Sequence, residues 1–130
     1  MRRHAPETEF EVAGLAEFPR ADIVGSYVEA DGRMIEALVA AGSRAIVHAG
    51  LPPGGPTPAE REALVAAAAS GVLVVQASLA GGRVVETTKG REAGFVAADT
   101  LTPRKARVLA KLALTASEDR ADIQRMFREY

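Results

Sequence analysis

The sequence has 130 residues, of which 48% are hydrophobic and 25% charged, as expected for one compact domain with a real core. With 16 basic and 17 acidic residues the net charge is −1, so no overall field draws the protein onto nucleic acid or an anionic membrane. The absence of cysteine excludes disulfides, a thiolate nucleophile and cysteine-ligated metals, and is compatible with a reducing, cytoplasmic compartment.

Residues 1–19 are expected to form a linker arm and a short extended segment, and residues 20–130 an α/β domain. The first nine residues are polar and carry Pro6, with no apolar run that would make a signal peptide or a membrane anchor. The apolar side chains of the segment that follows are expected to pack on the body of the domain. They are Phe10, Val12, Leu15 and Phe18.

Four short β-branched, apolar runs are predicted to form strands. They are 22–26, 44–48, 72–76 and 95–97. Runs with little polar alternation are typical of strands buried on both faces, and helix-like or Gly-rich segments separate them, so the pattern predicts a parallel, helix-covered sheet.

Two helices are marked by their ends. Asp31 is placed to cap the first, and Gly42 stands where a left-handed residue ends it. The second begins at Thr57-Pro58-Ala59-Glu60, where Glu60 completes a capping box, and runs to Ser70. The apolar spacing within the first helix predicts that one of its faces is buried.

The second half of the chain is predicted to contain a Gly-rich loop and two helices. Residues 78–90 form the loop, with an edge strand at 83–86. Thr102-Pro103 starts one helix and Ser117 caps the last. Residues expected to face inward from these helices are Val108, Leu109, Leu112, Ala113, Ile123, Met126, Phe127 and Tyr130.

Ligand sites in parallel sheets gather at the carboxyl ends of the strands. Ser26, His48 and Asp99 fall there and contain the residue types of a nucleophilic triad, but no Gly-x-Ser-x-Gly elbow accompanies them, and hydroxyls or Asp at strand ends commonly bind nearby backbone. His4 and His48 lack the spacing of a zinc site.

The Gly-rich loop 50–56 precedes a helix start, which favours anions, yet it has no phosphate-loop fingerprint and its three prolines remove donors. An independent module for a small amino acid or anion, using this edge and Thr57, stays open, as does a purely structural interaction domain. The basic run Arg104 to Lys111 has no interleaved aromatics and indicates a solvated helix face rather than a nucleic-acid site.

Across residues 10–130 the chain resembles the C-terminal domain of bacterial-type L-asparaginases. The matching segments are Phe10–Leu15, Pro19–Val24, Ala45–Gly50, Gly94–Leu101, Pro103–Leu109, Leu112–Thr115 and Ile123–Phe127. The resemblance implies a small three-layer, doubly wound α/β domain with a four-stranded, mainly parallel sheet and about four helices.

The resemblance also implies a role in hydrolysing asparagine to aspartate and ammonia, without a cofactor. In that family a threonine nucleophile with Thr, Asp and Lys partners lies on an N-terminal domain, which this sequence does not carry. The C-terminal domain packs in the dimer and reaches a neighbouring subunit's active site. We therefore expect no catalytic residue here, no activity from this chain alone, a homo-oligomer and an N-terminal partner domain.

Two positions are expected to contact substrate. The family's loop after the second strand presents a small polar side chain, whose counterpart here is Gly55, where a backbone N–H is the only donor. The family's carboxylate near the substrate amino group corresponds to Glu86, with Glu92 as second candidate. Leu79 stands where many relatives have Arg, which weakens any electrostatic role of its loop.

Overall fold

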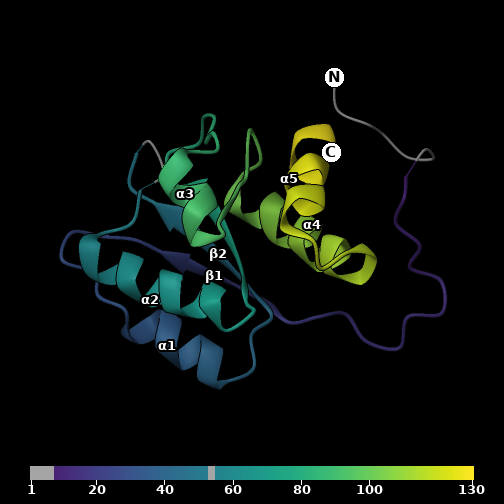
Figure 1. Cartoon of the computed structure of the whole chain (residues 1–130), viewed down its shortest axis with the longest axis horizontal. Helices are drawn as coiled ribbons and strands as arrows, with labels where there is room; N and C mark the ends of the chain where they lie inside the picture. The colour runs from purple at the N-terminus through teal and green to yellow at the C-terminus, as the bar shows by residue number, and fades with distance from the viewer. Residues whose placement is uncertain (1–7, 53–54) are drawn as a thin grey trace.

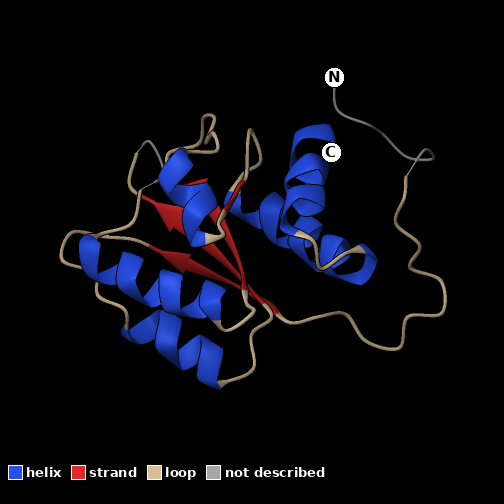
Figure 2. Cartoon of the chain, viewed as in Figure 1, coloured by secondary structure: helices blue, strands red, loops and turns tan. Residues whose placement is uncertain are grey.

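The computed structural model describes residues 8–52 and 55–130 and contains one parallel sheet of order β1-β2-β3-β4 (Figure 2). The strands are β1 (Ala21–Gly25), β2 (Ala45–Gly50), β3 (Leu73–Ser78) and β4 (Val96–Ala97). All six residues of β2 are buried, because helices cover both faces of this central strand. The four predicted strands are thus confirmed, with ends shifted by one or two residues.

Within the described residues, five helices complete a three-layer domain (Figure 1). On one face lie α1 (Arg33–Ala40), α2 (Pro58–Ala69) and α3 (Thr88–Ala93), and on the other lie α4 (Pro103–Ala116) and α5 (Arg120–Glu129). Each face has its own apolar core, one centred on Ile35 and Leu64 and the other on Phe127. The predicted three-layer class is confirmed, with one helix more than expected.

The additional helix is α3, in the stretch predicted to be loop with an edge strand at 83–86. In place of that strand the structure has an isolated antiparallel bridge between Val84 and Asp99. The hydroxyl of Thr87 accepts the N–H of Gly90 at 3.0 Å to cap α3, and Gly94, with φ of 84°, ends it. These capping residues outweigh the low helix propensity of Gly90 within the helix.

Four helix starts can be compared with their predictions, and the start of α4 at Thr102-Pro103 is confirmed. The capping box of Thr57 and Glu60 at α2 is confirmed, and so is the positive φ of Gly42. Asp31 is wrong as N-cap of α1, since Gly32 holds that place and the Asp31 carboxylate accepts the N–H of Arg33 instead. Ser117 is also wrong for α5, which Asp119 caps.

Several apolar side chains expected to pack are instead exposed. Val108 on α4 is 56% exposed, and the side chains of Val12, Leu15 and Phe18 in the extended segment are also open to solvent. The helical stripe of α4 is narrower than its sequence spacing suggests, because its buried members are Leu109 and three alanines, with Leu114 partly buried against the same core. The part of the predicted linker arm before residue 8 lies outside the described residues.

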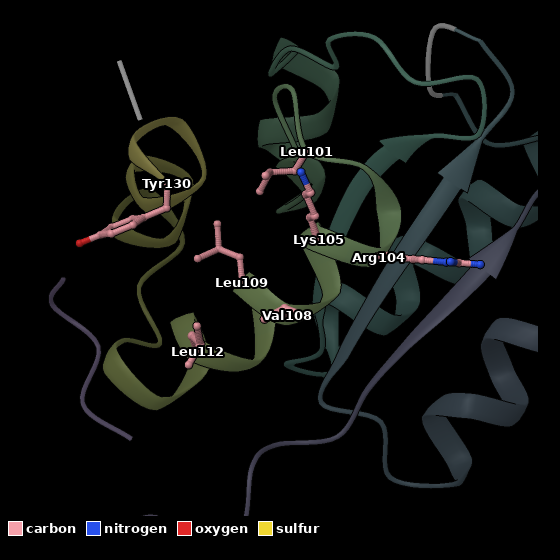
Figure 3. Close-up of a pocket in the computed structure, with 7 residues that line it drawn as sticks. All are labelled: Leu101, Arg104, Lys105, Val108, Leu109, Leu112 and Tyr130. Carbon is pink, nitrogen blue, oxygen red and sulfur yellow. The ribbon is translucent and has the colours of Figure 1, made fainter. Parts of the chain in front are cut away.

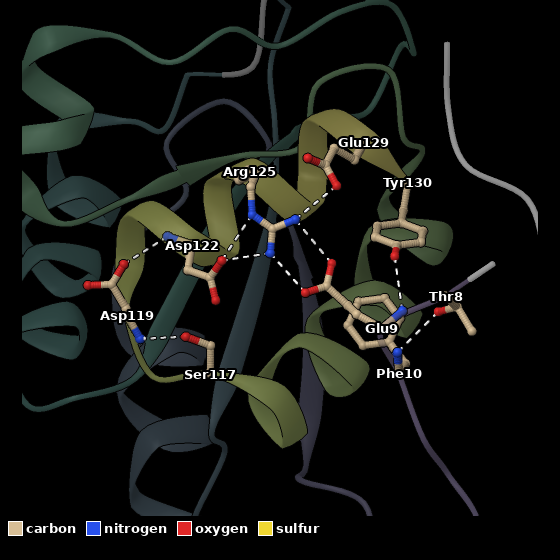
Figure 4. Close-up of polar contacts among 9 residues, drawn as sticks. All are labelled: Thr8, Glu9, Phe10, Ser117, Asp119, Asp122, Arg125, Glu129 and Tyr130. Atoms are coloured by element: carbon tan, nitrogen blue, oxygen red, sulfur yellow. Dashed lines mark hydrogen bonds and ion pairs between the residues drawn. The ribbon is translucent and has the colours of Figure 1, made fainter.

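The start of the described chain is held against α5 by Arg125 (Figure 4). This guanidinium binds the carboxylate of Glu9 through both oxygens, at 2.8 and 3.1 Å, and also contacts Asp122 and Glu129. The hydrogen bonds from Arg125 lower the pKa of Glu9. The ring of Phe10 packs on Tyr130, with centroids 5.0 Å apart. The first and last described residues therefore lie side by side.

Helices α1 and α2 approach closely at Gly32. A Cβ atom built on Gly32 would lie 2.7 Å from the Cβ of Ala63. We expect Gly32→Ala to lower the free energy of unfolding by about 1–3 kcal/mol, because the added methyl overpacks this contact. Urea unfolding of Gly32→Ala, Ala63→Gly and the double variant measures the coupling between the two sites. If the changes in unfolding free energy of the two single variants simply add in the double variant, the methyl added at Gly32 does not clash with Ala63.

Within the described residues, no helix is long and apolar enough to cross a membrane.

Candidate functional site

The carboxyl ends of β1 and β2 meet the start of α2 in a buried polar network. The Glu60 carboxylate accepts the hydroxyl of Ser26 at 2.5 Å through Oε1 and lies 2.8 Å from His48 Nε2 through Oε2. The backbone N–H of Thr57 adds a third contact to Oε1 at 3.0 Å. Ser26, His48 and Glu60 are respectively 5%, 0% and 1% exposed. The network ties two strands to the helix that follows them.

Burial by itself raises the pKa of Glu60, but the hydrogen bonds from Ser26, Thr57 and His48 outweigh it, so the net shift is downward. A carboxylate that accepts three donors is the ionised form. With His48 donating from Nε2, its Nδ1 is a buried acceptor that has no partner among the described residues. The Ser26 hydroxyl, the Thr57 N–H and His48 Nε2 are all bound to the Glu60 carboxylate, so none of them is directed at solvent.

This geometry is not the nucleophilic triad that the sequence allowed. A triad places the imidazole between the hydroxyl and the carboxylate, whereas here the carboxylate of Glu60 lies between Ser26 and His48. Asp99 is elsewhere and forms an ion pair with Arg83 Nε at 2.5 Å. The structure therefore brings Ser26 and His48 together without Asp99, and their burial keeps substrate away.

The loop between β2 and α2 carries the first predicted contact residue. Pro53 and Gly54 lie outside the described residues, and Gly55 is exposed. The N–H of Gly55 donates to the carbonyl of Leu51 at 3.0 Å, so the donor expected to face a ligand is used within the loop. At the start of α2 the N–H groups of Thr57 and Glu60 are likewise taken by the capping box. These bonds argue against an anion site there.

The second predicted contact residue, Glu86, lies in the loop between β3 and α3 and takes part in two ion pairs. Its Oε1 accepts from Arg91 Nη2 at 3.0 Å and from Arg128 Nη2 at 3.2 Å. The side chain is 19% exposed, so the carboxylate is partly accessible. Glu92 is exposed on α3, and Leu79, half exposed, packs beside Gly25. The loops of Gly55 and Glu86 leave the same edge of the sheet, from neighbouring strands.

In the part of the chain that the structure describes, the other cavities and charged faces hold no catalytic set. An apolar hollow of about 400 Å³ lies between α4 and the end of α5, lined mainly by leucines and Val108 (Figure 3). In the predicted basic run, Arg107 donates to the carbonyl of Ala21 at 2.6 Å, so it braces the edge of β1. The described residues include no group of His, Asp and Glu side chains that would hold a metal ion.

Sequence reasoning missed two features of this edge. The capping box identified Glu60 as a helix-start residue, but nothing local indicated that its carboxylate also reaches Ser26 and His48. Arg91 and Arg128, which hold Glu86, come from different helices, and no spacing rule connects them to it. The fold alone brings these partners together.

The match to the Glutaminase/Asparaginase C-terminal domain covers residues 20–127. Among curated relatives, L-asparaginase 2 of Escherichia coli is 39% identical over 132 residues, covering 99% of this chain and 38% of the relative. The probable periplasmic L-asparaginase of Haemophilus influenzae is 38% identical, covering 98% of this chain and 38% of the relative.

Among solved structures, the probable cytoplasmic L-asparaginase of Campylobacter jejuni superimposes with a TM-score of 0.95 at 33% identity. The superposition covers 99% of the present chain and 43% of the Campylobacter jejuni chain. The chain thus spans about two fifths of the length of the relatives it matches. It belongs to the glutaminase/asparaginase C-terminal domain family.

Proposed function

We propose that this chain serves as the C-terminal domain of an L-asparaginase-like amidohydrolase, which converts asparagine to aspartate and ammonia. It takes part in dimer assembly and completes a neighbouring subunit's active site. The observation that carries the proposal is the family match over residues 20–127 together with relatives that are named L-asparaginases and are much longer than this chain. Bond making belongs to the N-terminal domain, and no cofactor takes part.

The structure of the carboxyl edge supports an accessory role. A nucleophile and its base must face substrate within hydrogen-bond reach. Ser26 and His48 instead bind a buried carboxylate, and Asp99 binds Arg83. What this edge offers to a ligand is the surface of two loops, those of Gly55 and Glu86.

Ammonia release from asparagine tests the proposal directly. The purified chain is assayed alone and with a separately produced asparaginase N-terminal domain. We expect release only from the mixture, with a larger species in sedimentation. Release by this chain alone would contradict the proposal. Saturable binding of asparagine to the isolated monomer in calorimetry would favour the independent binding module.

Glu86 is the carboxylate that we propose to contact the substrate's amino group. An ammonium beside a partly desolvated carboxylate contributes roughly 1.5–3 kcal/mol. Arg91 and Arg128 hold the side chain in place through Oε1, so a substrate ammonium can use the other oxygen, Oε2.

We expect Glu86→Gln to raise the KM for asparagine about tenfold or more in the reconstituted enzyme, because the charge of this contact is lost. Steady-state kinetics measure it, and Glu92→Gln serves as the matched control because Glu92 is exposed on the adjacent helix. If the control raises KM and Glu86→Gln does not, Glu92 is the contacting carboxylate. If neither variant changes the KM, neither carboxylate contacts the substrate, and the result favours the purely structural interaction domain.

Gly55 is the second proposed contact position, and it departs from the family by lacking a polar side chain. A Cβ built on Gly55 meets no heavy atom within 4 Å, so an asparagine is accommodated. We expect Gly55→Asn to lower the KM for asparagine several-fold in the reconstituted enzyme, because a side-chain amide replaces the N–H that Leu51 occupies. Gly55→Ala is the control, and an equal effect from both would contradict a polar contact.

We also propose that residues 1–19 link the two domains and that the protein works in the cytoplasm. The family match begins at residue 20, which supports the boundary. The cysteine-free sequence supports the compartment, although one relative is named periplasmic. Cell fractionation tests the compartment, and limited proteolysis of a two-domain chain tests the linker.

A further inference from the structure

Arg120, the first residue of α5, carries a buried guanidinium nitrogen without a hydrogen-bond partner among the described residues. This atom is Nη1. The guanidinium packs on the backbone of Gly94, since a Cβ built there would lie 3.5 Å from Nη2 and 3.7 Å from Nη1. Burial lowers the pKa of Arg120, but an arginine remains cationic at neutral pH. Arg120 therefore places a charged, unsatisfied donor inside the domain.

A buried donor left unpaired is costly, and more so when it is charged. Folded proteins pair such groups with an acceptor, a water or an ion. The described residues supply no acceptor for Nη1. The residues that line the space beside Arg120 therefore determine what kind of acceptor can pair with its guanidinium.

Arg120 lines a hollow of about 320 Å³ at the amino ends of β2 and β3. The other lining residues are Arg44, Gly71, Leu73, Leu114, Glu118 and Ile123. Leu73 and Ile123 are buried and make an apolar floor, which strengthens electrostatic contacts above it. This hollow lies at the opposite ends of β2 and β3 from the loop of Gly55, and Arg120 also lines the neighbouring hollow that contains Glu86.

The charges of the hollow favour an anion. Arg44 is exposed, and its side chain makes no hydrogen bond or ion pair with a described residue. Glu118 is the single acidic lining residue, so two arginines face one carboxylate. The neighbouring hollow around Arg91 and Arg128 differs, because Glu86 binds both of those arginines.

We propose that the Arg44–Arg120 pocket binds a small oxyanion, a phosphate or a carboxylate, with the Arg44 and Arg120 guanidinium groups as donors. Guanidinium groups suit planar or tetrahedral oxyanions because their N–H donors are arranged as a fork. The proposed donors include neither Glu86 nor Gly55, and Arg44 does not line the hollow that contains Glu86, so a failure of the amidohydrolase role would leave this proposal standing.

The test is a titration of the isotope-labelled chain with sodium phosphate, and separately with sodium acetate, at constant ionic strength set by sodium chloride. We expect saturable NMR shifts of the amides of Arg44, Gly71 and Arg120 with one or both oxyanions, and none with chloride alone. Saturation by phosphate only assigns the pocket to phosphates, and saturation by both assigns it to oxyanions in general. Linear shifts without saturation would overturn the proposal.

Variants identify the donors. We expect Arg44→Gln and Arg120→Gln each to weaken binding about tenfold or more, because each removes a charge-assisted contact. Arg104→Gln makes the same charge change on an exposed residue outside the pocket and is expected to bind as the unmodified chain does. Equal affinity in all three variants would overturn the proposal.

Arg44 and Glu118 are exposed, so their variants keep the test valid if Arg120→Gln fails to fold. Glu118→Gln removes the like charge, and we expect it to tighten phosphate binding. Binding unchanged in Arg44→Gln and not tightened in Glu118→Gln would also overturn the proposal.

Discussion

Glu60→Ala is expected to lower the free energy of unfolding by about 3–5 kcal/mol at pH 7, because it leaves the Ser26 hydroxyl, the Thr57 N–H and His48 Nε2 without their shared acceptor. These donors are buried, and water replaces the lost carboxylate only by opening the contact between β1, β2 and α2. Urea unfolding followed by circular dichroism measures the loss. For a domain of this size it is a large part of the total stability.

The matched control is Glu62→Ala, since Glu62 is an exposed acid on the same helix. Its change is expected within about 0.5 kcal/mol. Ser26→Ala removes one donor together with its bond and is expected to cost less than Glu60→Ala, about 1–2 kcal/mol. Equal losses in Glu60→Ala and Glu62→Ala would show that the network adds nothing to stability.

The same network predicts a pH dependence. The folded pKa of Glu60 lies below its ordinary value of 4.5, owing to the three hydrogen bonds that outweigh burial. A depressed carboxyl pKa contributes stability in full above the unfolded pKa, and this contribution is lost as pH falls through the folded pKa. The stability difference between the unmodified chain and Glu60→Ala should therefore be constant above about pH 6 and narrow below pH 4.5. A difference that widens in acid would contradict this sign.

The sequence predicted the layers of the fold because the information there is local. Apolar runs mark β2 and β3, and the Thr-Pro starts mark α2 and α4, so each element is identified without knowing its neighbours. It failed at α3, where Gly90 within the helix suggested a loop. The caps at the two ends of this six-residue helix, Thr87 and Gly94, outweighed the unfavourable helix propensity of Gly90.

Side-chain partners were much less predictable, since they come from separate elements. Ser26 and His48 were identified as strand-end residues, but their shared partner is Glu60, whose capping role alone was visible. Asp99 instead pairs with Arg83, which lies 16 residues before it in the chain. Periodicity indicates which face a residue occupies and does not say which residue the folded chain places opposite it.

The free edge of β4 is closed by a side chain rather than by another strand. Gln124 of α5 is buried, and its amide bonds both polar groups of Ala97, accepting the N–H at 2.8 Å and donating to the carbonyl at 3.1 Å. On its other side β4 pairs with β3. One glutamine thus takes the place of a fifth strand and fixes α5 against the sheet edge.

We expect Gln124→Leu to lower the free energy of unfolding by about 2–4 kcal/mol, because the similar-sized side chain leaves a buried N–H and a buried carbonyl of Ala97 unpaired. Urea unfolding measures the stability, and hydrogen exchange should show earlier loss of the Ala97 amide than of Val75 in β3. Gln124→Asn is the graded control, since its amide is one methylene too short to make both bonds. An exposed strand edge also pairs with other chains, so light scattering should rise in Gln124→Leu before global unfolding. Unchanged Ala97 exchange in Gln124→Leu would mean that water satisfies this edge as well as the glutamine does.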